Sequence, residues 1–183
     1  MMKRNRSWRW PAALAALSMF SAAGAEEAPS CAAEPDLHLL DFWVGDWDVF
    51  VGDTLVGRDR IEPILGGCAI TETWRDRRGN EGRSLFYYLP ADRTWRQVWV
   101  TGRALAPGGL KEKTLVERLE HGGLRFQGEI RPPAGPAYLD RTTLEPGPRG
   151  KVRQIIEVSS DGGATWQATF DADYVRSDPA REE

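Results

Sequence analysis

Short segments in which hydrophobic and polar residues alternate follow one another along most of the chain. In the most distinctive stretch, residues 40–51 (LDFWVGDWDVFV), a dense apolar cluster comes first. Gly45 then lets the chain turn sharply, because glycine has no Cβ. Trp47, Val49 and Val51 next alternate with other residues, and a period of two is typical of a strand with one buried face. We therefore expect an apolar plug followed by the first strand of an all-β domain.

Further segments alternate in the same way or are rich in β-branched and aromatic residues, which favour strands. Gly, Pro, Asn and Asp residues, which form turns, separate these segments. A helix competes with a strand only at residues 110–119, and one helical turn is expected at residues 35–40. The expected strands are residues 47–51, 55–65, 69–75, 84–89, 95–101, 111–120, 124–130, 138–145, 151–159 and 165–176.

About ten short strands joined by hairpins predict a single antiparallel meander. A meander of this length tends to close on itself, because closure removes the unpaired edge strands. We therefore predict an all-β, up-and-down antiparallel barrel of about ten strands over residues 36–176, with a short N-terminal helical turn. Residues 26–35 are expected to form a flexible tail, and residues 177–183 a disordered one.

The N-terminal segment has the pattern of an export signal. Residues 1–10 carry four basic residues and no acidic ones, and residues 11–23 are small and apolar. An A-x-A pattern ends at Ala25, so we predict a signal peptide over residues 1–25, cleaved after Ala25, and a periplasmic or secreted protein. The alternative is a buried amphipathic N-terminal helix.

The net charge of the chain limits the classes of partner that it can bind. Cleavage of the signal takes away four basic residues and no acids, which changes the formal net charge from −3 to −7. An acidic protein lacks the basic footprint that nucleic acids need, and it is not attracted to anionic lipid. The apolar run of the signal is too short to span a bilayer, so no integral membrane contact is expected.

Two cysteines are present, Cys31 and Cys68. An exported protein meets an oxidising compartment, so we expect them to form a disulfide that ties the N-terminal tail to an early strand. Two free buried thiols are the alternative. The spacing excludes a catalytic CxxC pair.

Three neighbouring strands each place aromatic and polar side chains on a single face. These faces are Ile70, Glu72 and Trp74; Ser84, Phe86 and Tyr88; and Trp95, Gln97 and Trp99. On the preceding strand, Arg58 and Arg60 share a face with Glu62. A closed barrel lined in this way holds a cavity with a few hydrogen-bonding groups, the usual composition of a small-molecule site. The predicted ligand-binding residues are Arg60, Glu72, Trp74, Tyr88, Trp95, Gln97 and Trp99.

Glu72 is the most unusual member of this set. A carboxylate between tryptophans is costly unless it is paired, and Arg60 and Gln97 are the available partners. The favoured function is therefore a periplasmic barrel that binds a small apolar ligand. The alternatives are a non-catalytic interaction module with a filled core, and an enzyme that uses Glu72 as general acid or base. A shift of the pleat by one residue would invert every face.

Established catalytic and metal-binding patterns are absent. His38 and His121 are the two histidines, and neither has a second ligand at metal-binding spacing. No nucleophile stands beside a histidine in a triad pattern. We therefore expect no metal and no cofactor, and Glu72 is only a weak catalytic candidate.

The segment SSDGGATW at residues 159–166 resembles the Asp-box, a hairpin turn that is repeated in sialidase-type propellers. One copy in a short chain predicts a turn rather than a propeller. Asp161 can accept hydrogen bonds from backbone amides, Gly163 can take a positive φ, and Trp166 can pack beneath the turn.

Several motifs in combination resemble an exported bacterial family of unknown function with a lipocalin-like (calycin-type) barrel. These are FWxGxW at residues 42–47, Gly67-Cys68, Glu72-x-Trp74, Trp95-x-Gln97-x-Trp99-Val100 and the segment SxDGGxTW. The resemblance covers nearly all of residues 36–176. It implies a barrel, a Cys31–Cys68 bridge and an internal site, and it brings no established activity. Haem-binding relatives use a histidine on a late strand, where this chain has Tyr174; haem is expected only if Tyr174 faces the cavity, since tyrosine can ligate haem iron.

Overall fold

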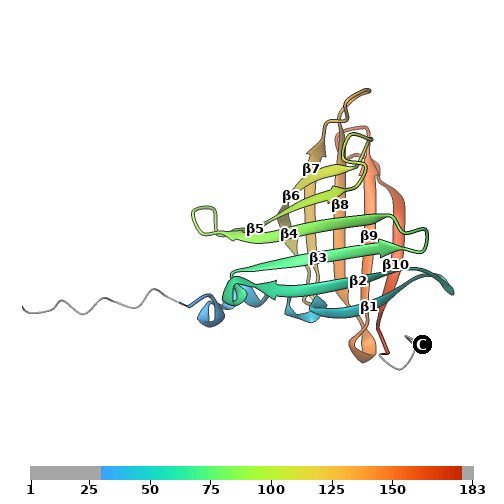
Figure 1. Ribbon diagram of the computed structural model, residues 1–183. Coiled ribbons are helices and arrows are strands. Elements are labelled where there is room, and N and C mark those ends of the chain that lie inside the picture. Colours follow the sequence, from blue (N-terminus) through green and yellow to red (C-terminus); the bar gives the residue numbers. More distant parts are fainter. Residues whose placement is uncertain (1–29, 179–183) are drawn as a thin grey trace, which may run out of the picture.

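The computed structural model describes residues 30–178 and contains a closed antiparallel barrel (Figure 1). Each strand pairs with its neighbours in sequence, and β1 pairs with β10 to complete the circle. The strands are β1 (Gly45–Val51), β2 (Thr54–Ile64), β3 (Ala69–Asp76), β4 (Glu81–Leu89), β5 (Thr94–Thr101), β6 (Leu110–Arg118), β7 (Leu124–Ile130), β8 (Tyr138–Pro146), β9 (Val152–Ser159) and β10 (Gln167–Arg176). The predicted ten-stranded meander barrel is confirmed.

The boundaries of a few elements differ from the predicted ones. β4 begins at Glu81, earlier than expected, because Arg75 and Glu81 pair across the β3–β4 turn. The stretch where a helix was the competing prediction forms β6, whose lysines at positions 111 and 113 alternate with outward residues. The predicted signal peptide lies outside the described residues. Within the described part of the chain, no helix has the length and apolar character that a membrane crossing requires.

Three short 3₁₀ helices plug one end of the barrel: η1 (Cys31–Ala33), η2 (Pro35–His38) and η3 (Asp41–Trp43) (Figure 1). Trp43 is fully buried and stands edge-on to Phe86, with ring centroids 5.4 Å apart. The Trp47 indole donates to the Trp43 carbonyl oxygen at 2.8 Å. This hydrogen bond fixes the plug to β1, so the expected apolar plug is present and forms part of the core. Two further 3₁₀ turns are η4 (Leu65–Gly67) and η5 (Pro148–Gly150).

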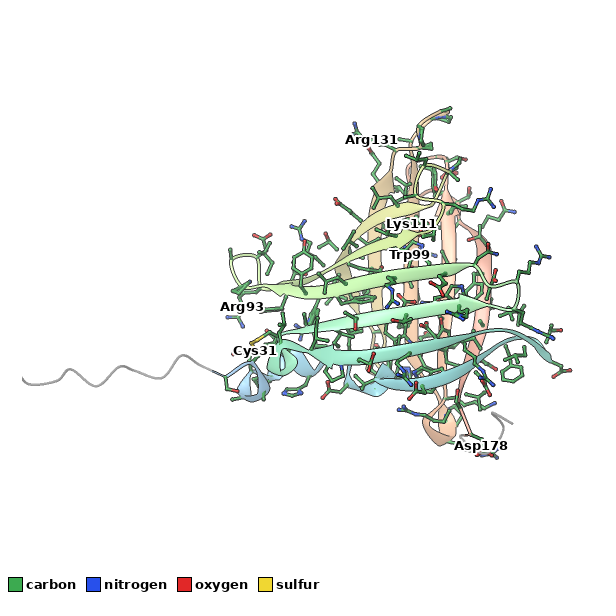
Figure 2. The ribbon with its side chains drawn as sticks, viewed as in Figure 1. Cys31, Arg93, Trp99, Lys111, Arg131 and Asp178 are labelled. Atoms are coloured by element: carbon green, nitrogen blue, oxygen red, sulfur yellow. A yellow bond between two sulfur atoms is a disulfide. The ribbon has the colours of Figure 1, made fainter. Side chains whose placement is uncertain are left out.

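Cys31 and Cys68 form the predicted disulfide, which joins η1 to the end of η4 (Figure 2). The described part of the expected N-terminal tail is therefore attached to the barrel. At the other end of the chain, the Ser177 amide donates to the Asp46 carbonyl oxygen at 3.0 Å. Regular contacts thus extend one residue beyond the predicted domain boundary.

The Asp-box segment forms the turn between β9 and β10 that its sequence predicts. The Thr165 amide donates to Asp161 Oδ1 at 2.9 Å, and Gly163 has a φ of +95°. Trp166 donates its indole N–H to the Gly163 carbonyl oxygen at 3.0 Å. The Arg141 guanidinium stacks on the Trp166 ring, 4.0 Å from the ring centroid. The motif residues Asp161, Gly163 and Trp166 therefore all take part in forming the turn.

The apolar core fills the half of the barrel next to the plug. Its largest fully buried side chains are Trp43, Trp47, Trp95, Tyr174, Phe86 and Phe126. A layer of buried polar and charged side chains follows at the middle level of the barrel, formed by Asp59, Glu72, Ser84, Gln97, Lys113, Thr142 and Gln154. The barrel interior is therefore apolar at the plugged end and polar above it.

Candidate functional site

An open cavity of about 190 Å³ lies inside the barrel, with the polar layer as its floor. Its apolar lining consists of Trp74, Trp99, Ile156 and Phe170. Its polar lining consists of Glu72, Gln97, Lys111, Lys113, Thr142, Gln154 and Tyr174. Figure 2 shows Trp99 and Lys111 near the centre of the barrel, where they are register partners on β5 and β6. The cavity therefore combines aromatic walls with a charged floor.

Two glycines keep this space open. A methyl group at Gly57 would stand 2.5 Å from the Trp74 ring, and one at Gly82 would stand 2.2 Å from the Trp99 ring. Each indole therefore lies directly against the backbone of the preceding strand, which only a residue without a Cβ permits. Phe170 stands edge-on to Trp74, with centroids 6.4 Å apart. The large rings line the wall and leave the centre free.

Two carboxyl groups meet on the floor of the cavity. Ile61 on β2 is directly opposite Glu72 on β3, so Asp59 is the diagonal neighbour of Glu72 on the inner face. Asp59 is 2 % exposed and Glu72 is 4 % exposed. Among the described residues, no Lys, Arg or His side chain donates a hydrogen bond to either Asp59 oxygen. Two buried carboxyls without a cation between them hold one proton in common.

The electrostatic environment assigns that proton to Asp59. Burial, and then the charge of Glu72, raise the pKa of Asp59 well above its usual range. Burial also raises the pKa of Glu72, but hydrogen bonds from Ser84 and Asp59 and the charge of Lys113 oppose this. The pKa of Asp59 is raised further than that of Glu72, so we place the shared proton on Asp59, from where it can be donated to Glu72. The Tyr174 hydroxyl beside them donates to Gln154 Oε1 at 2.9 Å.

A short relay orients Glu72. Ser84 is its register partner on β4 and donates its hydroxyl proton to Glu72 Oε2. The Gln97 amide in turn donates to Ser84 Oγ at 3.1 Å. Ser84 has a single hydroxyl proton, which it donates to Glu72, so it can only accept from Gln97. The hydroxyl therefore determines the orientation of both the Glu72 carboxyl group and the Gln97 amide. Gln97 acts on Glu72 through Ser84 and not directly.

The opposite side of the floor is basic. Lys113 Nζ lies 2.5 Å from Asp140 Oδ1 and 2.5 Å from Thr142 Oγ1, and Lys111 Nζ lies 2.6 Å from Asp140 Oδ2. β7 separates β6 from β8, and Gly128 is its residue opposite Asp140. An added methyl group at Gly128 would stand 1.9 Å from the Glu112 carbonyl oxygen, so glycine allows β6 to lie this close to β7. Burial lowers the pKa of Lys113 to about 8, although Asp140 and Glu72 oppose the shift. Lys113 therefore remains charged at neutral pH.

The structure brings four of the predicted binding residues into the cavity: Glu72, Trp74, Gln97 and Trp99. The face assignment was right for β3, β4 and β5. Glu72 does not take its charge partner from either of the residues proposed for that role. Its neighbours are Asp59 and Ser84, with Lys113 across the cavity.

Tyr88 and Trp95 lie at the plugged end instead, and the prediction that they line the cavity is wrong. The Tyr88 hydroxyl donates to Asp36 Oδ2 at 3.1 Å, and the Trp95 indole donates to the Asp36 carbonyl oxygen at 2.7 Å. Arg118 completes this cluster with a 2.9 Å ion pair to Asp36 Oδ1, and its hydrogen bond lowers the pKa of Asp36. These residues fasten η2 to the barrel.

Arg60 lies on the outer surface, so its predicted role in the site is also wrong. Its Nε is 2.6 Å from Asp46 Oδ1, and both side chains are exposed. The inner face of β2 carries Gly57, Asp59 and Ile61. Asp59 was missed, although two flanking arginines at alternate positions are a signal that the residue between them points inward.

The sequence analysis also missed the basic side of the cavity floor. Lys111, Lys113 and Asp140 were not singled out, because Lys-Glu-Lys on β6 has the same polar character on both faces. The pairing of these lysines with Asp140 becomes apparent only when the fold places β8 two strands away from β6. Local patterns do not carry such a contact.

Tyr174 faces the interior, which was the condition set for a haem ligand. However, its hydroxyl is committed to Gln154, and burial raises the pKa of Tyr174 well above its usual range, which opposes a phenolate ligand. The volume of about 190 Å³ is below the roughly 300–1,000 Å³ of sites for drug-sized ligands. The residues present do not fit haem.

The chain was compared with known proteins. No protein-family model matches it. No curated protein matches it either. Membership of the exported family that the motifs resemble stays a prediction.

Proposed function

We propose that this protein is a periplasmic barrel that binds a small, largely apolar ligand inside its cavity. One observation carries the proposal: Trp74 and Trp99 are packed against the backbone at Gly57 and Gly82, so the aromatic walls enclose space instead of filling it. A barrel selected only for stability would fill this level with side chains, because cavities cost free energy.

The size and lining of the cavity also support a ligand site. A cavity of about 150 Å³ can hold a benzene-sized guest, so about 190 Å³ accommodates one substituted ring. Buried polar groups beneath apolar walls are the usual means of orienting such a guest. An interaction module with a filled core has no use for this space. The predicted export signal supports the periplasmic location.

Tryptophan fluorescence tests the proposal, because Trp74 and Trp99 form the walls. Titration with single-ring aromatic probes should give saturable quenching, and native mass spectrometry should find one bound molecule per chain. Trp99→Leu should weaken binding about tenfold or more, the loss of one aromatic wall contact at about 1.4 kcal/mol. Val100→Ala, on the outer face of the same strand, serves as the control and should bind normally. Absence of saturation with every probe would contradict the proposal.

A second candidate is an enzyme that uses Glu72 as general acid or base. It is favoured by the raised pKa of Glu72 in an accessible cavity, with the Lys113 ammonium opposite it. In such a site Lys113 would bind the carbonyl oxygen of a ketone, while Glu72 removes an α-proton and returns a solvent proton.

Deuterium exchange tests this candidate. Acetophenone incubated with the protein in D₂O should lose its α-proton NMR signal faster than with Glu72→Gln. Equal exchange rates for the two proteins would reject proton abstraction for this class of ketone and leave binding as the function.

A further inference from the structure

We propose that the cavity selects an uncharged planar ring that carries a hydrogen-bond acceptor beside a donor, as in an aromatic carboxamide. The inference rests on the proposed binding function and specifies its ligand class. The acceptor faces Lys113 and the donor faces Glu72. This ligand preference follows from the charge balance of the cavity and from the unused hydrogen-bonding positions on its floor.

The charges around the cavity cancel. Lys111 and Lys113 supply two positive charges, and Asp140 and Glu72 supply two negative ones, while Asp59 holds the shared proton. A ligand with a net charge would leave one charge uncompensated in a buried site, which is strongly unfavourable. A neutral ligand preserves the balance.

Lys113 and Glu72, on the two sides of the cavity floor, nevertheless retain unused hydrogen-bonding positions. Lys113 has three N–H donors, of which Thr142 takes one, while Asp140 is the ion-pair partner of the ammonium group. Glu72 has about four acceptor positions, of which Ser84 and Asp59 take two. Both side chains line the same cavity, so one ligand can contact both. An acceptor and a donor on one end of the ligand match the remaining positions.

The rest of the cavity favours a flat apolar body. The indoles of Trp74 and Trp99 lie against the wall, and the ring of Phe170 stands at an interplanar angle of 84° to Trp74. Aromatic walls in offset and edge-on positions favour a planar ring between them. The volume limits the ligand to about one ring with its polar group.

Four probes of nearly equal size separate the possibilities: benzamide (neutral, donor and acceptor), benzoate (anion), benzamidine (cation) and toluene (no polar group). Isothermal titration calorimetry of the full-length protein at pH 7 should give benzamide an affinity about tenfold or more above each of the others, because each rival leaves a buried charge or polar group unpaired. Tighter binding of benzoate or benzamidine, or equal binding of toluene, would overturn the inference and leave the binding function in place. Absence of binding by all four probes would overturn the binding function itself.

Charge variants provide the independent check. Glu72→Gln leaves the cavity positive and should move the preference to benzoate. Lys113→Met leaves it negative, with Asp140 still paired to Lys111, and should move the preference to benzamidine. The surface variants Glu62→Gln and Lys151→Met change the same net charge and should leave the preference for benzamide unchanged. A parallel change in the surface variants would overturn the inference.

Discussion

The six-membered ring of Trp99 rests on the backbone of Gly82, where an added methyl group would stand 2.2 Å from it. Gly82→Ala should therefore push this ring into the cavity and weaken the binding of benzamide about tenfold or more, the effect of losing about 1.4 kcal/mol. Gly102→Ala is the matched control, since an added methyl group there meets no atom within 4 Å. Fluorescence titration checks both variants, and normal binding by Gly82→Ala would contradict the role of the glycine.

The shared proton makes stability depend on pH. Because the pKa of Asp59 is raised in the folded state, the folded protein holds a proton that the unfolded chain releases above its ordinary value of 3.8. Stability from this group therefore falls as pH rises from 3.8 towards the folded-state pKa.

Asp59→Asn removes this dependence while it keeps a donor to Glu72. Between pH 4 and pH 7 the variant should gain about 1.4 kcal/mol or more relative to the native protein, the equivalent of one pKa unit. Urea unfolding at the two pH values measures the difference, with the exposed turn variant Asp53→Asn as control. A constant difference between native protein and Asp59→Asn would show that Asp59 is ionised in the fold.

Ligand preference should also change with pH. The pKa of Lys113 is lowered to about 8, so above this pH the Lys113 ammonium loses its charge. Lys111 then faces Asp140 and Glu72 alone, and the cavity becomes negative. The affinity for benzamidine should therefore rise as pH passes 8, and Lys113→Met should already bind benzamidine tightly at pH 7 without a further rise. A flat profile in the native protein would contradict this placement of Lys113.

The cluster around Asp36 should affect stability and not binding. Asp36→Ala removes the acceptor of Tyr88 and the partner of Arg118, and loss of these charge-assisted bonds should cost about 2 kcal/mol. Urea unfolding measures the loss. The affinity for benzamide should stay unchanged, since the cluster lies at the plugged end. A large loss of affinity would return Tyr88 and Trp95 to the binding site.

The alternation of side chains predicted the ten strands and the inner faces of β3, β4 and β5 because each of those faces mixes aromatics with single polar residues. It failed on β2, where Arg58, Asp59 and Arg60 are all charged and the pattern gives no apolar face to follow. Trp95 was assigned to the correct face but to the wrong level, because alternation does not record the distance from the plug.

The charged floor shows a different limit. The ion pair between Lys113 on β6 and Asp140 on β8 joins strands that are not neighbours, and it passes over β7 at Gly128. Local sequence patterns do not encode this arrangement, which depends on closure of the barrel. The acidic side of the floor could be predicted in part from the sequence, since Glu72 was identified as a carboxylate that needs partners.

A bound ligand should occupy the space between Trp74 and Trp99. The indole N–H signals of the tryptophans in a proton–nitrogen NMR spectrum, assigned with Trp→Phe variants, report on this directly during titration with benzamide, benzoate, benzamidine and toluene in turn. At least one probe should give saturable shifts for Trp74 and Trp99, while the signals of Trp95 at the plugged end and Trp166 in the outer turn stay in place. Unchanged signals for Trp74 and Trp99 with every probe, or shifts confined to Trp166, would contradict this placement of the ligand.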